Sequence, residues 1–408
     1  MDKKNIVVFG GDYYPYPSQN GVCLQNLITG WKNYANITVI AYNQDNGEKY
    51  RTIDGIKYVF INSPSNKLYN KFRFDKSRKA KFILGILRIW RGLKTALFWL
   101  RYDGNYYRKC IRETNKLVKK GEADVILAAC YPFSAIYAAY KCNKKSGIEY
   151  ITYILDVNSE AKNLRKFCLF PHTYKKRDIV AEMNILRYAK MNFLSEGFVY
   201  AKMFDYVKQR GVPYKIVGFP LLSKKVPVKT QPGNEITLFY AGAFVKGVRE
   251  PYGLMKLFSN ERLKNVKLIL CTIGDCQEEL ASWAKQYDNV EFKGGVERNV
   301  ANSFADNADI LINVSNKNQH QIPSKIFEYF QRCKPIVNLY YDDKQKNMFA
   351  GYPLTLHIQQ ENISEADVDA FIKFCNEAKG MYEDINTVLE NYKEYSIEYL
   401  QNLFLQEI

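Results

Sequence analysis

The segment Gln321–Val337 reads QIPSKIFEYFQRCKPIV, and its pattern predicts a short helix followed directly by a buried strand. Pro323 suits the first turn of that helix, where a backbone N–H is not needed. The free N–H groups of the first turn and the helix dipole favour an anion there, and Lys325 adds a full positive charge. Glu328 follows Ser324 by about 6 Å along the helix axis. We therefore predict a helix start that binds a phosphate, with a carboxylate one turn further on that accepts the hydroxyls of an attached ribose.

Glu328 has a second interpretation. Lys325 and Arg332 stand at helical spacing from it, so the carboxylate could be an ordinary surface group that pairs with one of them. The residues alone leave both interpretations open.

Strands and helices alternate on both sides of this segment. Short apolar strands separated by helices are typical of parallel sheets whose two faces are both covered. The predicted strands are Asn5–Gly10, Ile37–Tyr42, Ala123–Cys130, Tyr150–Leu155, Lys190–Glu196 and Tyr214–Pro220, then Ile236–Gly242, Val266–Gly274, Asn289–Gly295, Ala308–Ser315 and Lys334–Tyr341.

A polar stretch divides the two sets of strands. Residues Leu221–Glu235 contain two prolines and a glycine and predict a linker. A chain of 408 residues is also long for a single core. We expect two Rossmann-like α/β domains, residues 1–220 and 221–408, that face each other across a cleft at the carboxyl ends of their strands.

Cysteine and histidine usage favours a reducing compartment without a structural metal. The nine cysteines form no C-x-x-C motif and are irregularly spaced, and the three histidines have no metal-ligand spacing. The chain opens on a strand pattern rather than a signal sequence, and no apolar run approaches the roughly 18 residues of a membrane span. We expect a cytoplasmic protein.

The segment Tyr240–Pro251, YAGAFVKGVREP, leads from a strand through a glycine-containing loop into a helix. Gly242 would let the backbone approach a ligand closely. Lys246 and Arg249 could neutralise a diphosphate, and arginine can do so through two parallel hydrogen bonds. A solvated turn with incidental charges is the alternative. The loop lacks the G-K-[ST] of a P-loop.

Two further candidates lie in the first half. Gly21 ends the loop Gly10–Gly21, GGDYYPYPSQNG, just before a helix, and could permit close approach of a sugar phosphate or an acceptor. Asp156 ends the strand Tyr150–Leu155 and could orient or deprotonate an acceptor hydroxyl. An ordinary surface loop and a helix-capping aspartate are the alternatives.

The order of these features resembles the retaining GT-B glycosyltransferases, especially glycosyltransferase family 4. Those enzymes have two Rossmann-like domains, and we expect the C-terminal helix to return to the first domain. The resemblance covers nearly the whole chain and is strongest over Ile236–Tyr340. The residues that carry it are Gly242, Lys246, Arg249, Pro323, Ser324, Lys325, Glu328, Tyr329, Lys334–Val337 and Gly218–Leu222.

The resemblance implies roles for individual residues. Glu328 would hold the donor ribose, Arg249 and Lys246 the diphosphate, and Gly21 would face the donor sugar. Gly242, Ser324 and Lys325 would complete the donor site. His320 stands where the family usually carries a second glutamate, and Asp156 is our substitute for a histidine of the first-domain cleft that has no counterpart here.

The implied activity is transfer of a sugar from a nucleoside-diphosphate sugar to a glycan or lipid-linked acceptor, in surface polysaccharide or glycolipid synthesis. We expect retention of configuration and no metal requirement, because cations and the helix start would stabilise the leaving diphosphate. The sole D-x-D, Asp367–Asp369, lies far from the donor motifs and is interpreted as a solvated face. A non-catalytic nucleotide-sugar-binding or scaffold protein and a nucleotide-sugar epimerase remain alternatives.

One segment holds most of the basic charge. Residues 67–120 contain 17 Lys and Arg against three acids, which is +14 of the net charge of +17. On a helix, the stretch Lys71–Arg101 has an apolar and a basic side. The apolar side comprises Phe82, Ile86, Ile89, Trp90, Leu93, Leu97 and Leu100, and the basic side Lys81, Arg88, Arg91, Lys94 and Arg101.

Such a helix is typical of the membrane interface, where each basic residue near an anionic surface contributes roughly 1 kcal/mol. We expect peripheral binding to the inner membrane face through residues 71–101. The alternative is a helix that packs its apolar face on the first-domain sheet. No nucleic-acid motif accompanies the charge, so we expect no nucleic-acid partner.

Overall fold

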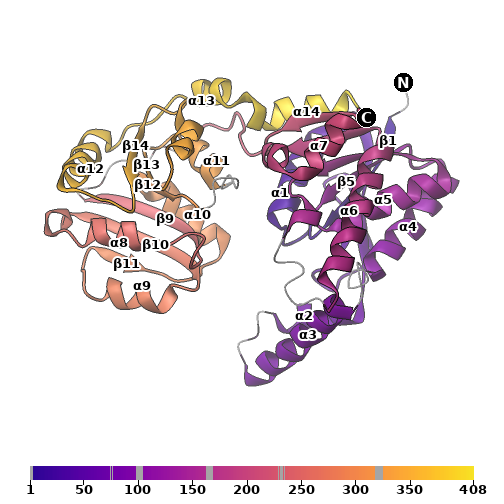
Figure 1. Ribbon diagram of the computed structural model, residues 1–408, viewed down its shortest axis with the longest axis horizontal. Coiled ribbons are helices and arrows are strands. Elements are labelled where there is room, and N and C mark those ends of the chain that lie inside the picture. Colours follow the sequence, from indigo (N-terminus) through magenta and orange to yellow (C-terminus); the bar gives the residue numbers. More distant parts are fainter. Residues whose placement is uncertain are drawn as a thin grey trace. The chain divides into compact units, whose positions relative to one another are not determined.

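The computed structural model describes residues 3–73, 75, 77–97, 104–161, 169–227, 229, 233, 235–317 and 325–408. The chain forms two compact units (Figure 1). The first comprises Met1–Pro220 together with Ile397–Ile408, and the second comprises Leu221–Ser396.

The first unit is built on a sheet of eight described strands in the order β3-β4-β2-β1-β5-β6-β7-β8. The strands are β1 Lys4–Gly11, β2 Ala35–Tyr42, β3 Tyr50–Ile53, β4 Ile56–Ile61, β5 Val125–Cys130, β6 Glu149–Ile154, β7 Met191–Ser195 and β8 Tyr214–Val217. The described strands pair in parallel except for the hairpin of β3 and β4. Asp54 and Gly55 form its two-residue turn, both with positive φ (49° and 80°), as tight hairpin turns require.

Helices cover both faces of this sheet. Alternate residues of β1 point to opposite faces, and Val7 and Phe9 share a core with buried side chains of α4, α5 and α6. These three helices lie next to one another (Figure 1). The α-helices are α1 Gln19–Thr29, α2 Pro64–Phe72, α3 Arg78–Leu97, α4 Gly104–Lys119, α5 Phe133–Ser146, α6 Pro171–Tyr188, α7 Lys202–Gln209 and α14 Ile397–Leu405. Short 3-10 turns span Gly30–Asn33, Asn158–Glu160 and Glu196–Tyr200.

The C-terminal helix α14 completes the first unit. Phe404 is fully buried, stacks on Phe193 with 3.6 Å between ring centroids, and meets Tyr153 edge-on at 5.3 Å. The indole N–H of Trp31 donates to the Gln401 carbonyl at 3.2 Å. The expected return of the last helix to the first domain is therefore confirmed.

The second unit is a parallel α/β sheet. Its described strands run in the order β11-β10-β9-β12-β13-β14 and pair in parallel. They are β9 Ile236–Phe244, β10 Val266–Gly274, β11 Val290–Phe292, β12 Ile310–Val314, β13 Ile336–Tyr340 and β14 Thr355–Gln359. The helices are α8 Tyr252–Phe258, α9 Gln277–Ala284, α10 Arg298–Asn307, α11 Lys325–Phe330, α12 Glu365–Ala378 and α13 Ile385–Asn391, with 3-10 turns at Glu261–Leu263, Asp343–Phe349 and Lys393–Tyr395.

The expected fold class of two Rossmann-like α/β domains is thus confirmed. In the part of the chain that the structure describes, no helix combines the length and the hydropathy needed to cross a bilayer.

Truncating the buried ring of α14 should destabilise the first unit. We expect Phe404→Ala to lower the free energy of unfolding by about 3–5 kcal/mol, because it leaves a cavity against Phe193 and Tyr153. Urea unfolding monitored by circular dichroism measures this loss. Asn402→Ala, at an exposed position of the same helix, should change stability by less than about 0.5 kcal/mol. If Phe404→Ala lowers the free energy of unfolding as little as Asn402→Ala does, the ring of Phe404 does not stabilise the fold.

Candidate functional site

Packing of α11 fixes the position of Glu328. Ile326, Phe327, Tyr329 and Phe330 are buried, so the apolar residues of the helix face the core. The Ala241 N–H donates to the Tyr329 hydroxyl at 3.3 Å, which joins α11 to the carboxyl end of β9. Glu328 lies on the remaining side of the helix, and its side chain is 15% exposed.

The Glu328 carboxylate is paired with two cations. Lys325 Nζ lies 2.7 Å from one oxygen and Arg298 Nη2 lies 2.9 Å from the other. The pairing with Lys325, which the sequence left open, therefore exists. Arg332 instead donates to the Glu328 backbone carbonyl and to the Asp306 carboxylate, both at 2.8 Å. The two pairs keep the carboxylate oriented at the surface, where lone pairs remain for further donors.

Gly242 and Arg249 meet at the carboxyl end of β9. A Cβ atom on Gly242 would lie 2.8 Å from the Tyr240 hydroxyl, which is too close, and 3.4 Å from Arg249 Nη1, so glycine is needed here to make room for the Tyr240 hydroxyl. Burial raises the pKa of Tyr240, and the Arg249 charge beside it acts in the opposite direction. Arg249 Nε also donates to the buried Asn316 side chain at 2.9 Å, at the end of β12.

Lys246 points to a different neighbour. Its Nζ lies 4.0 Å from the Glu279 carboxylate, and its side chain is 60% exposed. The loop that carries it turns through Gly247, whose φ of 76° belongs to the left-handed region. Lys246 is therefore a largely solvated charge beside Glu279 of α9.

Two predicted donor residues, Ser324 and His320, lie outside the described residues, as does Pro323. Within the described ranges, no group of three or more His, Cys, Asp or Glu side chains could hold a metal ion. The D-x-D residues have other contacts. Asp367 accepts from the Ser364 backbone N–H at 2.8 Å and closes the capping box of α12, and Asp369 pairs with Arg262.

In the first unit, Gly21 is buried in the first turn of α1, which Ser18 caps. A Cβ there would lie 2.3 Å from the Asp12 carbonyl oxygen. The absence of a side chain at Gly21 thus allows the backbone of the preceding loop to pack closely against α1. Glycine is required at this position by packing alone, whatever else the loop contacts.

Asp156 lies two residues after the end of β6 and is exposed, and partial desolvation raises the pKa of its carboxyl. The turn behind it is held by Glu182 of α6, which sequence reasoning missed. The Glu182 carboxylate accepts from the backbone N–H groups of Asn158 at 2.7 Å and Ser159 at 3.1 Å. Burial raises the Glu182 pKa to about 7. A capping acid that titrates near neutrality therefore supports the segment that carries Asp156.

The first unit also contains a large polar pocket of about 960 Å³, which the sequence did not reveal. It lies where the carboxyl ends of β2 and β4 meet α1, α2, α3 and α4. Its lining includes amide, hydroxyl and cationic side chains, among them Gln19, Asn20, Asn43, Gln44, Asn62, Ser63, Asn66, Asn70, Arg73, Arg91, Lys94, Asn105 and Lys109. A wall of this composition suits a hydrophilic ligand.

Comparison with known proteins bears on the fold. No protein-family model matches the chain, and no curated protein matches it by sequence. Solved structures match along nearly its whole length. Sucrose-phosphate synthase from Thermosynechococcus elongatus is 11% identical with a TM-score of 0.61, covering 99% of this chain and 98% of that one.

Two other structures agree. An α,α-trehalose 6-phosphate synthase from Burkholderia multivorans is 10% identical with a TM-score of 0.58, covering 100% of this chain and 98% of that one. WaaG, a glycosyltransferase involved in lipopolysaccharide biosynthesis, is 11% identical with a TM-score of 0.53, covering 98% of this chain and 99% of that one. At these identities the likeness shows the fold, and this chain has the two-domain GT-B architecture of glycosyltransferases.

Titration of Glu182 should appear in the stability of the protein. Its folded-state pKa of about 7 lies above the usual value of 4.5, so the proton is bound more tightly in the folded state. The resulting stabilisation is complete below pH 4.5 and is lost as the pH rises to 7, by up to about 3 kcal/mol.

Urea unfolding of wild type and Glu182→Gln between pH 5 and 8 measures this effect. We expect the wild type to lose stability relative to the variant as the pH rises, because glutamine has no proton to release. A stability difference that stays constant over this range would contradict the assignment.

Proposed function

We propose that this protein is a glycosyltransferase that transfers a sugar from a nucleoside-diphosphate sugar to a glycan or lipid-linked acceptor, in surface polysaccharide or glycolipid synthesis. The main support is the pair of groups that flank the carboxyl end of β9: Arg249 beside Gly242, and Glu328 on α11 joined to Ala241 through Tyr329. Ligands of open α/β sheets bind beyond the carboxyl ends of the strands. The GT-B architecture makes the donor nucleotide the natural ligand of that edge.

In this proposal, each group has a part of the donor to hold. Arg249 binds the diphosphate, and Gly242, which lies beside its guanidinium at the carboxyl end of β9, forms part of the same site. Glu328, oriented by Lys325 and Arg298, accepts the ribose hydroxyls. We propose that Ser324 and His320 complete the donor site, His320 standing where family 4 usually carries a second glutamate.

The chemistry follows the developing charge. Breaking the bond between sugar and phosphate leaves negative charge on the departing diphosphate, and Arg249, Lys325 and the start of α11 stabilise it where it forms. Lys246, a solvated charge on the neighbouring turn, adds a further cation for the diphosphate. We propose that these cations replace a divalent metal and that the configuration at the anomeric carbon is retained.

In this proposal, residues of the first unit activate the acceptor. Asp156 stands at the carboxyl end of β6 with a raised pKa, and Glu182 holds its turn. A carboxylate in this position could orient the acceptor hydroxyl and receive its proton. Gly21 closes the neighbouring loop by packing on Asp12.

Membrane attachment is supported by α3. Its apolar side is turned to solvent rather than to the sheet: Phe82 is 71% and Ile89 66% exposed, and Ile86, Trp90, Leu93 and Leu97 are about half exposed. The opposite side, with Ala80 and Leu87, is buried, and α3 lies beside α2 (Figure 1). An exposed row of large apolar residues with flanking cations fits the interface of an anionic bilayer. We propose that α3 binds the inner membrane face and brings the enzyme to a lipid-linked acceptor.

Donor binding tests the nucleotide site. Thermal unfolding with UDP-, GDP- and other nucleotide sugars should reveal one that stabilises the protein, by about 2.7 kcal/mol at 100 times its Kd. We expect Arg249→Gln and Glu328→Gln each to raise that Kd about tenfold or more, since each removes a charge-assisted hydrogen bond. Arg262→Gln removes a surface cation of the same unit that pairs with Glu365 and Asp369, and it should bind normally.

Turnover separates the transferase from its alternatives. Release of nucleoside diphosphate should require both donor and acceptor and should persist in EDTA. A non-catalytic protein would bind the donor without turnover, and an epimerase would convert it without acceptor. Activity that disappears in EDTA and returns with Mn²⁺ would overturn the metal-independent mechanism.

Liposome flotation tests the membrane interface. The wild type should float with anionic vesicles and less with neutral ones. Phe82→Ser/Ile89→Ser, which removes two exposed apolar side chains of α3, and Lys81→Glu/Arg88→Glu, which reverses two charges, should both reduce flotation. Tyr34→Ser, at an equally exposed aromatic outside α3, serves as the control. If all four proteins float alike, α3 is not the membrane contact.

A further inference from the structure

The pocket of the first unit is strongly cationic. Arg73, Arg91, Lys94 and Lys109 line it, whereas Asp12 is the sole carboxylate among its described lining residues. Asp12 is exposed and accepts from the Gln44 amide at 2.9 Å. The positive charge of the wall therefore exceeds the negative charge by a wide margin, which favours an anionic ligand.

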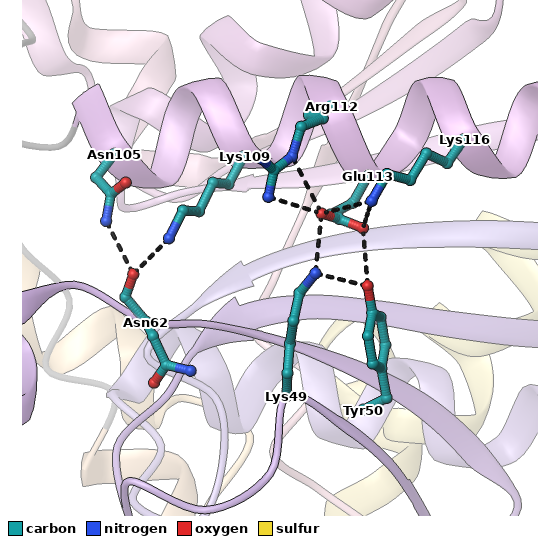
Figure 2. Close-up of polar contacts among 8 residues, drawn as sticks. All are labelled: Lys49, Tyr50, Asn62, Asn105, Lys109, Arg112, Glu113 and Lys116. Carbon is teal, nitrogen blue, oxygen red and sulfur yellow. Dashed lines mark hydrogen bonds and ion pairs between the residues drawn. The ribbon is translucent and has the colours of Figure 1, made fainter.

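Lys109 has a carboxylate one turn away, yet that group is engaged elsewhere. Glu113 is 4% exposed and contacts Lys49, Arg112 and Lys116 at 3.1 to 3.2 Å, and the Tyr50 hydroxyl donates to it at 3.3 Å (Figure 2). Three cations contact this one acid, so positive charge already exceeds the charge of Glu113 before Lys109 is counted.

The contacts of Lys109 itself are consistent with a surplus of positive charge. Its Nζ donates to the Asn62 carbonyl at 2.6 Å, a neutral acceptor (Figure 2). Burial lowers the Lys109 pKa, and the charges of Arg112 and Lys49 lower it further. A phosphate near this ammonium would relieve the repulsion between neighbouring cations.

The same pocket presents amide groups suited to hydroxyls. Asn43 is 2% exposed, and its amide nitrogen donates to the Gly47 carbonyl at 2.8 Å. Further amide side chains line the pocket, among them Asn20, Asn66 and Asn105. An amide side chain both donates and accepts hydrogen bonds, so such a wall can bind the hydroxyls of a sugar.

We propose that this pocket binds the phosphoryl group of a sugar-phosphate acceptor, with Lys109, Lys94 and Arg91 around the phosphate and the amide wall around the sugar hydroxyls. The acceptor role rests on the proposed function, whereas the phosphate recognition rests on the pocket itself. Two of the three cations belong to α3, whose apolar residues lie on its exposed side. The sugar phosphate could therefore be carried by a lipid or be free in solution.

Titration calorimetry of the full chain with a hexose 6-phosphate, and with the same hexose lacking phosphate, tests the proposal. The phosphate ester should bind more tightly, and its Kd should rise with salt. Lys109→Gln and Lys94→Gln should each raise the Kd about ten- to a hundredfold, as expected for a lost charge-assisted contact. Asn105 still donates to the Asn62 carbonyl at 2.9 Å in the Lys109 variant, so the local fold should persist, which circular dichroism checks.

Arg108→Gln is the matched control, since Arg108 is an exposed cation of α4 next to Lys109 but outside the pocket lining. It should bind the hexose phosphate as the wild type does, and so should Arg249→Gln. Equal binding of phosphorylated and plain hexose would overturn the proposal. So would unchanged binding by the pocket variants, or loss in Arg249→Gln alone, which would place the phosphate in the donor site.

A second probe distinguishes a lipid-linked sugar phosphate from one that is free in solution. This probe is a hexosyl phosphate with a long alkyl chain, presented in neutral micelles. Tighter binding of this probe, lost in Lys94→Gln, supports a lipid-linked acceptor, and preference for the chain-free ester supports a soluble one. If nucleotide sugars stabilise the protein while neither phosphate probe binds, the proposal that this pocket binds a phosphate is wrong. The proposed transferase function is not affected by that result.

Discussion

Burial of α11 is the constraint on which the candidate donor site depends. The helix is short, and short helices are held by packing rather than by propensity. Phe327 stacks on Tyr395 at 3.9 Å, and Phe330 lies within 5 Å of both Tyr352 and Tyr392, measured between ring centroids. Together with the hydrogen bond between Tyr329 and Ala241, these contacts fix the position of α11 and keep Glu328 on the side of the helix that does not enter the core. The chemistry at the end of β9 thus depends on aromatic packing supplied by residues far along the chain.

The two sheets were largely predictable because their strands are buried on both faces and read as continuous apolar runs. The hairpin of β3 and β4 was missed. Its strand Tyr50–Ile53 alternates between exposed and half-buried residues and has no apolar run, although the Asp54-Gly55 pair was a usable turn signal. The strand β14 was missed for the same reason, since three of its five residues carry polar side chains.

The site was predictable only where its residues are close in sequence. Gly242 and Arg249 were both selected from one loop, and the structure brings them together. The second cation on Glu328, Arg298, is 30 positions away, and no local pattern indicates it. The cationic pocket draws on six separate segments of the chain, so its volume could not be anticipated. The exposed side of α3 required the structure as well, because amphipathicity alone does not tell which neighbour a helix faces.

The return of α14 has a consequence for how the protein is made. The first unit contains the start of the chain, yet Phe193 and Tyr153 stay uncovered until Phe404 has been synthesised and has left the ribosome. The second unit, Leu221–Ser396, is complete eight residues before Phe404. The first unit therefore cannot complete its folding as soon as residues 1–220 have been synthesised. An apolar surface of this unit stays exposed until α14 has been made, while the second unit can already fold.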